Sequence, residues 1–251
     1  MDTFKSILGE FMNGHVLNTL YENKINHAYV IKALEDKMAT TVFEFRSTET
    51  PELSYAAIWH EDNIVSLFGD KVWCQECFHQ YLGYYSFYDI DPGLMEALCA
   101  DADMRRLSNY DLENHYLMRL DHNGIKEIVD RFKALNRGDR CIKEVKTIQN
   151  TTRYQYLERD GRILGSVLLE KITENVFVIS EMLIKKPFRD KGFAFDFISR
   201  LLGGRIPPIT NGVENEIILH VDVKNTPALK LYKKLGFKKV GAYQNLVHKD
   251  D

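Results

Sequence analysis

Cysteine is scarce in this sequence, with four residues among 251, at Cys74, Cys77, Cys99 and Cys141. So few, scattered cysteines cannot form the disulfide framework that holds small secreted proteins together. No apolar run approaches the ~18–20 residues that a membrane-spanning helix needs. The first residues also lack the basic flank and apolar stretch of a secretory signal. We therefore expect a cytoplasmic protein with reduced thiols and no membrane association.

Motifs for metals and nucleotides are equally scarce. Cys74, Cys77 and His79 resemble half of a zinc site. A structural zinc site needs a second pair of ligands, and none follows in the sequence. We expect two reduced cysteines on a helix and no metal. Neither the dinucleotide fingerprint G-x-G-x-x-G nor the P-loop G-x-x-x-x-G-K-[ST] occurs.

The charge is divided unevenly along the chain. Residues 1–110 contain 8 Lys or Arg against 17 Asp or Glu, a formal charge of −9, whereas residues 111–251 carry +6. The polar segment Ser108–Asn114 lies at this change, so we predict two domains, 1–110 and 111–251. The acidic first half argues against nucleic-acid binding. The basic half can hold a polyanion, although ordinary solvated faces would give the same composition.

The first region has the pattern of an α+β domain. Its apolar residues recur at helical or alternating spacing. The predicted helices lie near 4–12, near 28–34, after Asp70 and after Pro92, and the predicted strands lie at 41–45, 53–59 and 64–68, the last two as a hairpin. The aromatic cluster between Tyr81 and Tyr88 is expected to pack in the core, with the wall of an acceptor cleft as the alternative.

The second region alternates strands with short helices. We predict strands at 115–120, 154–157, 163–169, 176–184, 217–223 and 239–247, and helices at 125–135, 189–202 and 226–235. Asp160-Gly161 predicts a type I′ hairpin turn, whereas Gly138 and Gly236 are expected to end helices. This order predicts an α+β fold with an open mixed sheet flanked by helices.

One turn in this region has the composition of an anion site. Arg189-Asp190-Lys191-Gly192-Phe193-Ala194 leads from a strand into a helix, with Lys185 and Lys186 just before it. A helix N-terminus offers unpaired N–H groups and the positive end of the helix dipole, so it attracts phosphate. Gly192 lets the backbone approach an anion closely because it has no Cβ. Taken alone, the segment could also be an ordinary basic turn.

A second segment makes the pattern more specific. The turn resembles the R-x-x-G-x-A acyl-CoA signature of the GNAT superfamily of N-acetyltransferases. Residues 225–237 resemble that family's N-x-x-A-x-x-x-Y-x-x-x-G-F segment at every stated position. The resemblance covers about residues 115–250. It includes the two-domain layout of the glycine N-acyltransferase-like group, in which residues 1–110 would shape the acceptor site or form a degenerate second copy of the fold.

The resemblance implies roles for individual residues. The backbone of Arg189, Asp190, Lys191, Gly192, Phe193 and Ala194 would hold the pyrophosphate of acetyl-CoA, and that of Met182, Leu183 and Ile184 would pair with the pantetheine arm. Asn225 would contact the cofactor, although it could simply cap the next helix. Tyr232 would be the general acid, with plain core packing as the alternative.

A general base is also needed, because an amine must lose a proton before it attacks a thioester. Glu181, late in its strand, is the first candidate, and His220 is the second. A salt-bridge partner and a satisfied core histidine are the respective alternatives.

These observations predict an N-acetyltransferase. It would move an acetyl group from acetyl-CoA to a primary amine of a small molecule or peptide by direct attack in a ternary complex. The alternative is a non-catalytic acyl-CoA-binding sensor or interaction protein, against which the presence of Tyr232 argues. The acceptor, the acyl chain length and the oligomeric state, including a homodimer, stay open.

Overall fold

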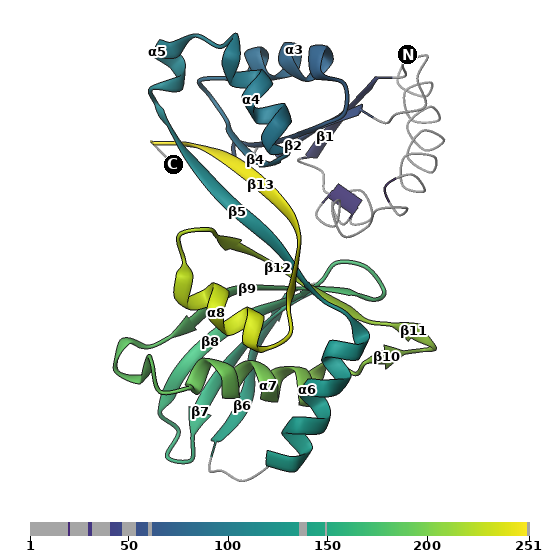
Figure 1. The fold of residues 1–251 in the computed structure, drawn as a ribbon, viewed down its shortest axis with the longest axis vertical. Helices are drawn as coiled ribbons and strands as arrows, with labels where there is room; N and C mark the ends of the chain where they lie inside the picture. The colour runs from purple at the N-terminus through teal and green to yellow at the C-terminus, as the bar shows by residue number, and fades with distance from the viewer. Residues whose placement is uncertain are drawn as a thin grey trace. The chain divides into compact units, whose positions relative to one another are not determined.

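The chain forms two units. The computed structural model describes residues 20, 30–31, 41–46, 54–59, 62–135, 140–148 and 150–249. Unit 1 comprises Met1–His115 and Gly241–Asp251, and unit 2 comprises Tyr116–Val240. The chain therefore enters unit 2 within strand β5, Tyr110–Leu120, and leaves it within strand β13, Lys238–His248 (Figure 1). Most of the helices predicted near 4–12 and 28–34, and the helix end predicted at Gly138, lie outside the described residues.

Unit 1 contains a mixed sheet with strand order β1-β2-β3-β4-β13. Its elements are β1 Thr41–Arg46, β2 Ser54–Trp59, β3 Ile64–Phe68, α3 Lys71–Tyr81, β4 Ser86–Ile90, α4 Pro92–Ala100 and α5 Met104–Leu107. Neighbouring strands are antiparallel except β3 and β4, which are parallel and joined through α3. The predicted strands, the β2–β3 hairpin and the helices after Asp70 and Pro92 are confirmed.

Helix α3 begins at its own acidic cap. The Asp70 side chain accepts a hydrogen bond from the Trp73 N–H at 2.9 Å, which satisfies one of the free amides at the helix start. Cys74 and Cys77 are buried on α3, and burial raises the pKa of the Cys74 thiol to about 12. His79 is exposed on the same helix. The inner face of α3 is therefore part of the unit 1 core.

The aromatic cluster contributes mainly to that core. Phe87 is fully buried, and its ring centroid lies 4.6 Å from that of Phe78 on α3. Tyr81 and Tyr85 meet edge to face at 5.3 Å, whereas Tyr84 is exposed. Core packing accounts for these contacts.

Unit 2 contains a second mixed sheet segment, with strand order β5-β12-β9-β8-β7-β6. Its remaining elements are α6 His122–Leu135, β6 Arg140–Ile148, β7 Thr151–Glu158, β8 Ile163–Lys171, β9 Val176–Ile184, the 3₁₀ helix η1 Lys186–Phe188, α7 Phe193–Arg205, β10 Ile209–Thr210, β11 Val213–Glu214, β12 Glu216–Asp222 and α8 Thr226–Lys234. Strands β9 and β12 are parallel, whereas the neighbouring pairs β6–β7, β7–β8 and β8–β9 are antiparallel. The predicted α+β fold with a mixed sheet is confirmed.

Strand β4 and the short elements α5, β10 and β11 were not predicted from the sequence. Two further predictions were incomplete or wrong. Strand β6 was not predicted, because it lies at the sheet edge with mostly exposed side chains and charges interrupt its apolar pattern. The predicted type I′ turn is absent: Gly161 has φ of 84°, but Asp160 is not in the left-handed region that this turn requires. A longer loop joins β7 and β8 instead, closed by a hydrogen bond from the Glu158 N–H to the Arg162 carbonyl at 3.0 Å.

The core of unit 2 lies between the sheet and its helices. Helices α6 and α7 pack against each other across one face of the sheet (Figure 1). On that face the ring of Tyr156 stacks on Phe197 of α7, with centroids 4.9 Å apart. Gly236 follows α8 with φ of 92°, as predicted for a residue that ends a helix. No helix in the described part of the chain is long and apolar enough to cross a bilayer.

The same order of elements occurs twice along the chain. In unit 1 the antiparallel strands β1, β2 and β3 lead through α3 to the parallel strand β4, then through α4 and the short α5 to β5. In unit 2 the antiparallel strands β7, β8 and β9 lead through α7, with the short elements η1, β10 and β11 inserted, to the parallel strand β12, then through α8 to β13.

Candidate active site

Strand β9 carries a bulge near its C-terminal end. Glu181 has φ of 47°, in the left-handed region that non-glycine residues rarely adopt. The register between β8 and β9 shifts there, because Leu168 pairs with Ser180 whereas Ser166 pairs with Leu183. A bulge of this kind bends a strand and turns its edge.

The opposite edge of β9 is only partly paired. Its parallel ladder with β12 runs from Val176 to Val178. Beyond Val178, no described residue of β12 pairs with β9. Met182, Leu183 and Ile184 therefore lie in a stretch with one open backbone edge, which can pair with an extended amide chain.

Gly165 on β8 permits this arrangement. A Cβ atom built on Gly165 would lie 2.4 Å from the carbonyl oxygen of Leu183 and 2.8 Å from Cδ1 of Ile184. The close approach of β8 to the bulged part of β9 thus requires a residue without a side chain.

The turn after β9 is tightly folded. Asp190 has φ of 60° and Gly192 has φ of 78°, so two left-handed residues flank Lys191. Gly192 is the N-cap of α7 and makes no side-chain cap hydrogen bond. A Cβ atom built there would meet nothing within 4 Å. The start of α7, with its unpaired amides, therefore faces open space.

Cationic side chains surround that helix start. The Arg189 Nε donates to the Ile184 carbonyl at 3.0 Å, and the Lys191 Nζ donates to the Pro187 carbonyl at 2.9 Å. These bonds hold both cations against the turn. Lys185 and Lys186 are exposed beside them. Helix dipole and side-chain charge thus favour an anion at the same place.

Helix α8 carries the second predicted group of site residues. Asn225 caps it, since its Oδ1 accepts from the Ala228 N–H at 3.2 Å. Tyr232 is 7% exposed, and its ring meets Phe237 edge to face at 5.6 Å. Burial raises the pKa of Tyr232 to about 12, so the phenol is protonated at neutral pH. That is the form a general acid requires.

The two candidate bases lie in different surroundings. Glu181 is exposed and pairs with Arg153 of β7 at 2.8 Å. His220 is half-buried on β12. Among the described residues, no hydrogen bond or ring contact joins Glu181 to Tyr232. The structure thus places Glu181 on the bulge itself, and it gives the carboxylate a salt-bridge partner.

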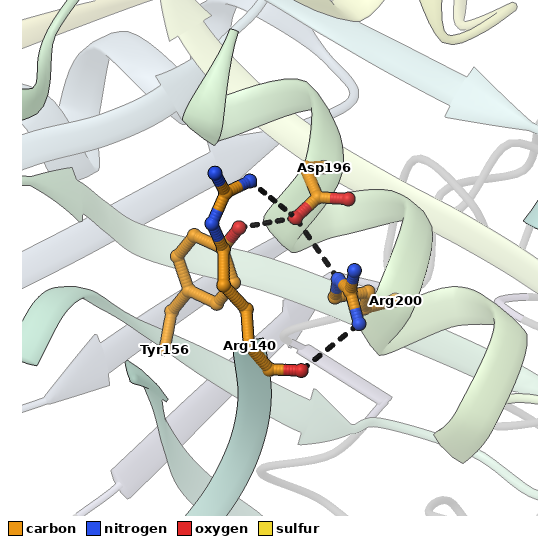
Figure 2. Close-up of polar contacts among 4 residues, drawn as sticks. All are labelled: Arg140, Tyr156, Asp196 and Arg200. Carbon is orange, nitrogen blue, oxygen red and sulfur yellow. Dashed lines mark hydrogen bonds and ion pairs between the residues drawn. The ribbon is translucent and has the colours of Figure 1, made fainter. Parts of the chain in front are cut away.

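A four-residue cluster around Asp196 of α7 was not identified from the sequence (Figure 2). One carboxylate oxygen of Asp196 accepts from the Tyr156 hydroxyl and from the Arg200 Nε at 2.9 Å, and it lies 3.5 Å from Arg140. Burial raises the pKa of Asp196, but these hydrogen bonds and the two guanidinium charges outweigh burial and lower it overall. Only the i,i+4 spacing of Asp196 and Arg200 is visible in the sequence.

A pocket also occurs in unit 1. Its volume is about 430 Å³, and its lining consists of Pro92, Gly93, Met95, Glu96, Cys99, Leu112 and Gln244. None of the predicted cofactor residues contributes to it. Among the described residues, no group of three or more His, Cys, Asp or Glu side chains could hold a metal ion.

Comparisons with known proteins bear on the family and on the fold. Residues 123–237 match the acetyltransferase (GNAT) family. No curated protein sequence is significantly similar to the chain. Among solved structures, a GCN5-related N-acetyltransferase from Kribbella flavida is similar at 10% identity and a TM-score of 0.56, over 87% of this chain and 94% of that one.

Two further structures are similar. One is a GCN5-related N-acetyltransferase from Sphaerobacter thermophilus, at 15% identity and a TM-score of 0.50, over 77% of this chain and 75% of that one. The other is a tandem GNAT protein from the clavulanic acid biosynthesis pathway, at 10% identity and a TM-score of 0.50, over 87% and 86%. At such low identity these likenesses concern the fold alone.

Proposed function

We propose that unit 2, whose residues 123–237 match the acetyltransferase (GNAT) family, transfers an acetyl group from acetyl-CoA to a primary amine of a small molecule or peptide. The observation that carries this proposal is the uncapped start of α7, where Gly192 faces open space among cations. A diphosphate fits such a site because it needs several N–H donors and positive charge.

The cofactor would lie along β9 and the turn that follows. The amides of Gly192, Phe193 and Ala194 would hold the diphosphate, with Arg189 and Lys191 adding charge. The open edge of β9 from Met182 to Ile184 would pair with the amide groups of the pantetheine arm. Asn225 lies at the start of α8 and would contact the cofactor in addition to capping the helix.

Acetyl-CoA supplies a thioester that an amine attacks directly. A backbone N–H on the open edge of β9 would stabilise the negative charge that develops on the carbonyl oxygen, and one such donor is typically worth ~3–4 kcal/mol. Tyr232 would donate its phenol proton to the leaving thiolate, as a hydrogen bond or by transfer. Burial raises the pKa of Tyr232 to about 12, above the ordinary pKa of a thiol, so the phenol stays protonated at neutral pH and its hydrogen bond stabilises the thiolate.

Glu181 is our first candidate for the base, acting directly or through water. Its exposed carboxylate stands on the bulge beside the proposed pantetheine segment, but its pairing with Arg153 competes with this role. His220 remains the second candidate. The variants Glu181→Gln and His220→Asn separate the two candidates. Only replacement of the true base should lower the rate constant for an amine acceptor whose pKa lies well above the assay pH, because such an amine must lose a proton before it attacks.

Unit 1 would be a second copy of the fold without a cofactor site. The repeated order of strands and helices supports this assignment. In unit 1 the start of α3 is equivalent to the start of α7. There the Asp70 carboxylate already accepts the hydrogen bond of the Trp73 N–H, which a phosphate would need. A carboxylate at that position also repels an anion. The alternative role, shaping of the acceptor site, is compatible with such a copy.

The cofactor assignment is tested by Gly192→Glu, with Gly212→Glu as the matched control. Both glycines have left-handed φ, 78° and 80°, and a Cβ at either one meets nothing within 4 Å. The two variants therefore carry the same backbone strain and the same added charge. Calorimetry with acetyl-CoA should give one site per chain for the wild type and for Gly212→Glu, and none for Gly192→Glu. Equal binding by both variants would remove the assignment, and residual binding by Gly192→Glu would place a second site elsewhere.

Turnover is a separate question from binding. A thiol-release assay with acetyl-CoA and a panel of primary amines measures it. Binding without thiol release on any amine would favour the acyl-CoA sensor over the enzyme. Release with an amine, abolished in Gly192→Glu and retained in Gly212→Glu, would support the transferase.

A further inference from the structure

An acidic residue stands where the proposed cofactor site needs positive charge. Asp196 is the fourth residue of α7, within the first turn of the helix whose free amides would bind a diphosphate. Its side chain is 31% exposed, so its charge is only partly screened by solvent. A negative charge this close to an anion site opposes binding unless other groups compensate it.

The compensation comes from three residues on three elements (Figure 2). Tyr156 on β7 and Arg200 on α7 donate hydrogen bonds to Asp196, and Arg140 on β6 pairs with it at 3.5 Å. Two guanidinium groups therefore face one carboxylate, and the cluster keeps a net charge of +1. The cluster thus adds net positive rather than negative charge beside the first turn of α7.

The same contacts anchor the helix start mechanically. The guanidinium carbon of Arg140 lies 4.4 Å from the ring centroid of Phe193, the first residue of α7. The Arg200 Nη1 donates to the backbone carbonyl of Arg140 at 3.0 Å. Tyr156 is fully buried and stacks on Phe197 one turn further along. The first turn of α7 is thereby tied to β6 and β7.

We propose that Arg140 is a positioning residue of the cofactor site. Arg140 neutralises Asp196 and holds the first turn of α7 so that the backbone N–H groups of this turn can donate hydrogen bonds to a diphosphate. This inference rests on the proposed acetyl-CoA site. Arg140 acts through Asp196 rather than by touching the cofactor. Removal of its charge therefore matters only while Asp196 is charged.

The test is a double-mutant cycle with two ligands. Dissociation constants for coenzyme A and for pantetheine, which lacks the phosphates, are measured by calorimetry for the wild type, Arg140→Gln, Asp196→Asn and the double variant. Arg140→Gln should weaken coenzyme A binding by about two- to fivefold, as expected for one charge near a helix terminus. Pantetheine binding should not change. The double variant should regain wild-type affinity for coenzyme A.

Arg131→Gln is the matched control, because Arg131 is an exposed arginine on α6 that pairs with Glu127, four residues earlier on the same helix, at 3.3 Å. It should leave both affinities unchanged. The effect of Arg140→Gln should also shrink between low and high salt, since charge interactions are screened. Thermal melting of each variant verifies that it folds.

The outcomes separate the two proposals. If the wild type does not bind coenzyme A, the cofactor assignment fails. If the wild type binds but Arg140→Gln binds equally well, or if Asp196→Asn does not rescue it, the positioning role is overturned. Equal weakening of coenzyme A and pantetheine would also overturn it, because the cluster would then act only as a structural tie.

Discussion

Replacement of Gly165 by alanine should damage both the stability of unit 2 and its affinity for acetyl-CoA. The added Cβ would lie 2.4 Å from the Leu183 carbonyl oxygen, which is well inside van der Waals contact. That oxygen belongs to the backbone, so the clash cannot be relieved by turning a side chain. Strand β9 must move away from β8, and it must do so at the bulge beside Glu181.

The size of the effect follows from two opposing terms. Overpacking of one methyl group in a packed interior costs about 1–3 kcal/mol. Replacement of glycine also lowers the conformational entropy of the unfolded chain, which stabilises the folded state by about 0.4–1 kcal/mol. The net loss is therefore at most about 2.6 kcal/mol and about 1.3 kcal/mol at the midpoints of the two ranges. The midpoint corresponds to a decrease of roughly 3–5 °C in the melting temperature of a chain of this size. Displacement of one backbone hydrogen bond to the cofactor costs ~1 kcal/mol more, or about fivefold in dissociation constant.

The assay combines urea unfolding with calorimetric titration of acetyl-CoA, and Gly204→Ala is the matched control. Gly204 lies near the end of α7, where a Cβ meets nothing within 4 Å, so the same substitution should stabilise the helix by up to about 1 kcal/mol. Opposite signs for the two variants are expected. If Gly165→Ala were as stable as the wild type and bound acetyl-CoA equally well, the close approach of β8 to β9 would not be required.

Two further predictions concern α8. Tyr232→Phe should lower kcat about 100-fold, which is typical for loss of a general acid, and leave the acetyl-CoA dissociation constant unchanged; an unchanged kcat would remove the acid role. Because the pKa of Tyr232 is about 12, its ionisation should cause no decline in wild-type kcat until the pH approaches that value. Asn225→Ala should cost ~1 kcal/mol of stability in urea unfolding through loss of the bond to Ala228. Asn225→Asp keeps the cap. Weaker acetyl-CoA binding by this variant without a loss of stability would therefore separate a cofactor contact from the cap.

The candidate site divides into parts that could and could not be predicted. The turn at Gly192 and the capped start of α8 depend on residues adjacent in sequence, so their spacing identified them. The roles of Glu181 and His220 stay predictions, because the sequence says nothing of their partners. The salt bridge from Glu181 to Arg153 joins residues 28 positions apart and is a product of the sheet.

The cluster around Asp196 illustrates the same limit. Its members Arg140 and Asp196 lie 56 positions apart, and Arg140 belongs to the edge strand whose apolar pattern is too weak to predict. The tyrosine in the cluster, Tyr156, reads from the sequence as an ordinary strand residue. Only the packing of α7 on β6 and β7 brings these residues into contact.

The sequence by itself determined the local features of this protein. Apolar periodicity placed most of the strands and helices, the left-handed Gly236 ended a helix, and two spaced motifs pointed to the acetyltransferase (GNAT) family that residues 123–237 match. Such features depend on interactions within a few residues, and a single chain segment encodes them. The tertiary structure alone decided that β12 lies between β5 and β9, that β9 bulges at Glu181, and that Arg140 reaches α7. These outcomes depend on which distant surfaces bury each other best, and no local pattern specifies that.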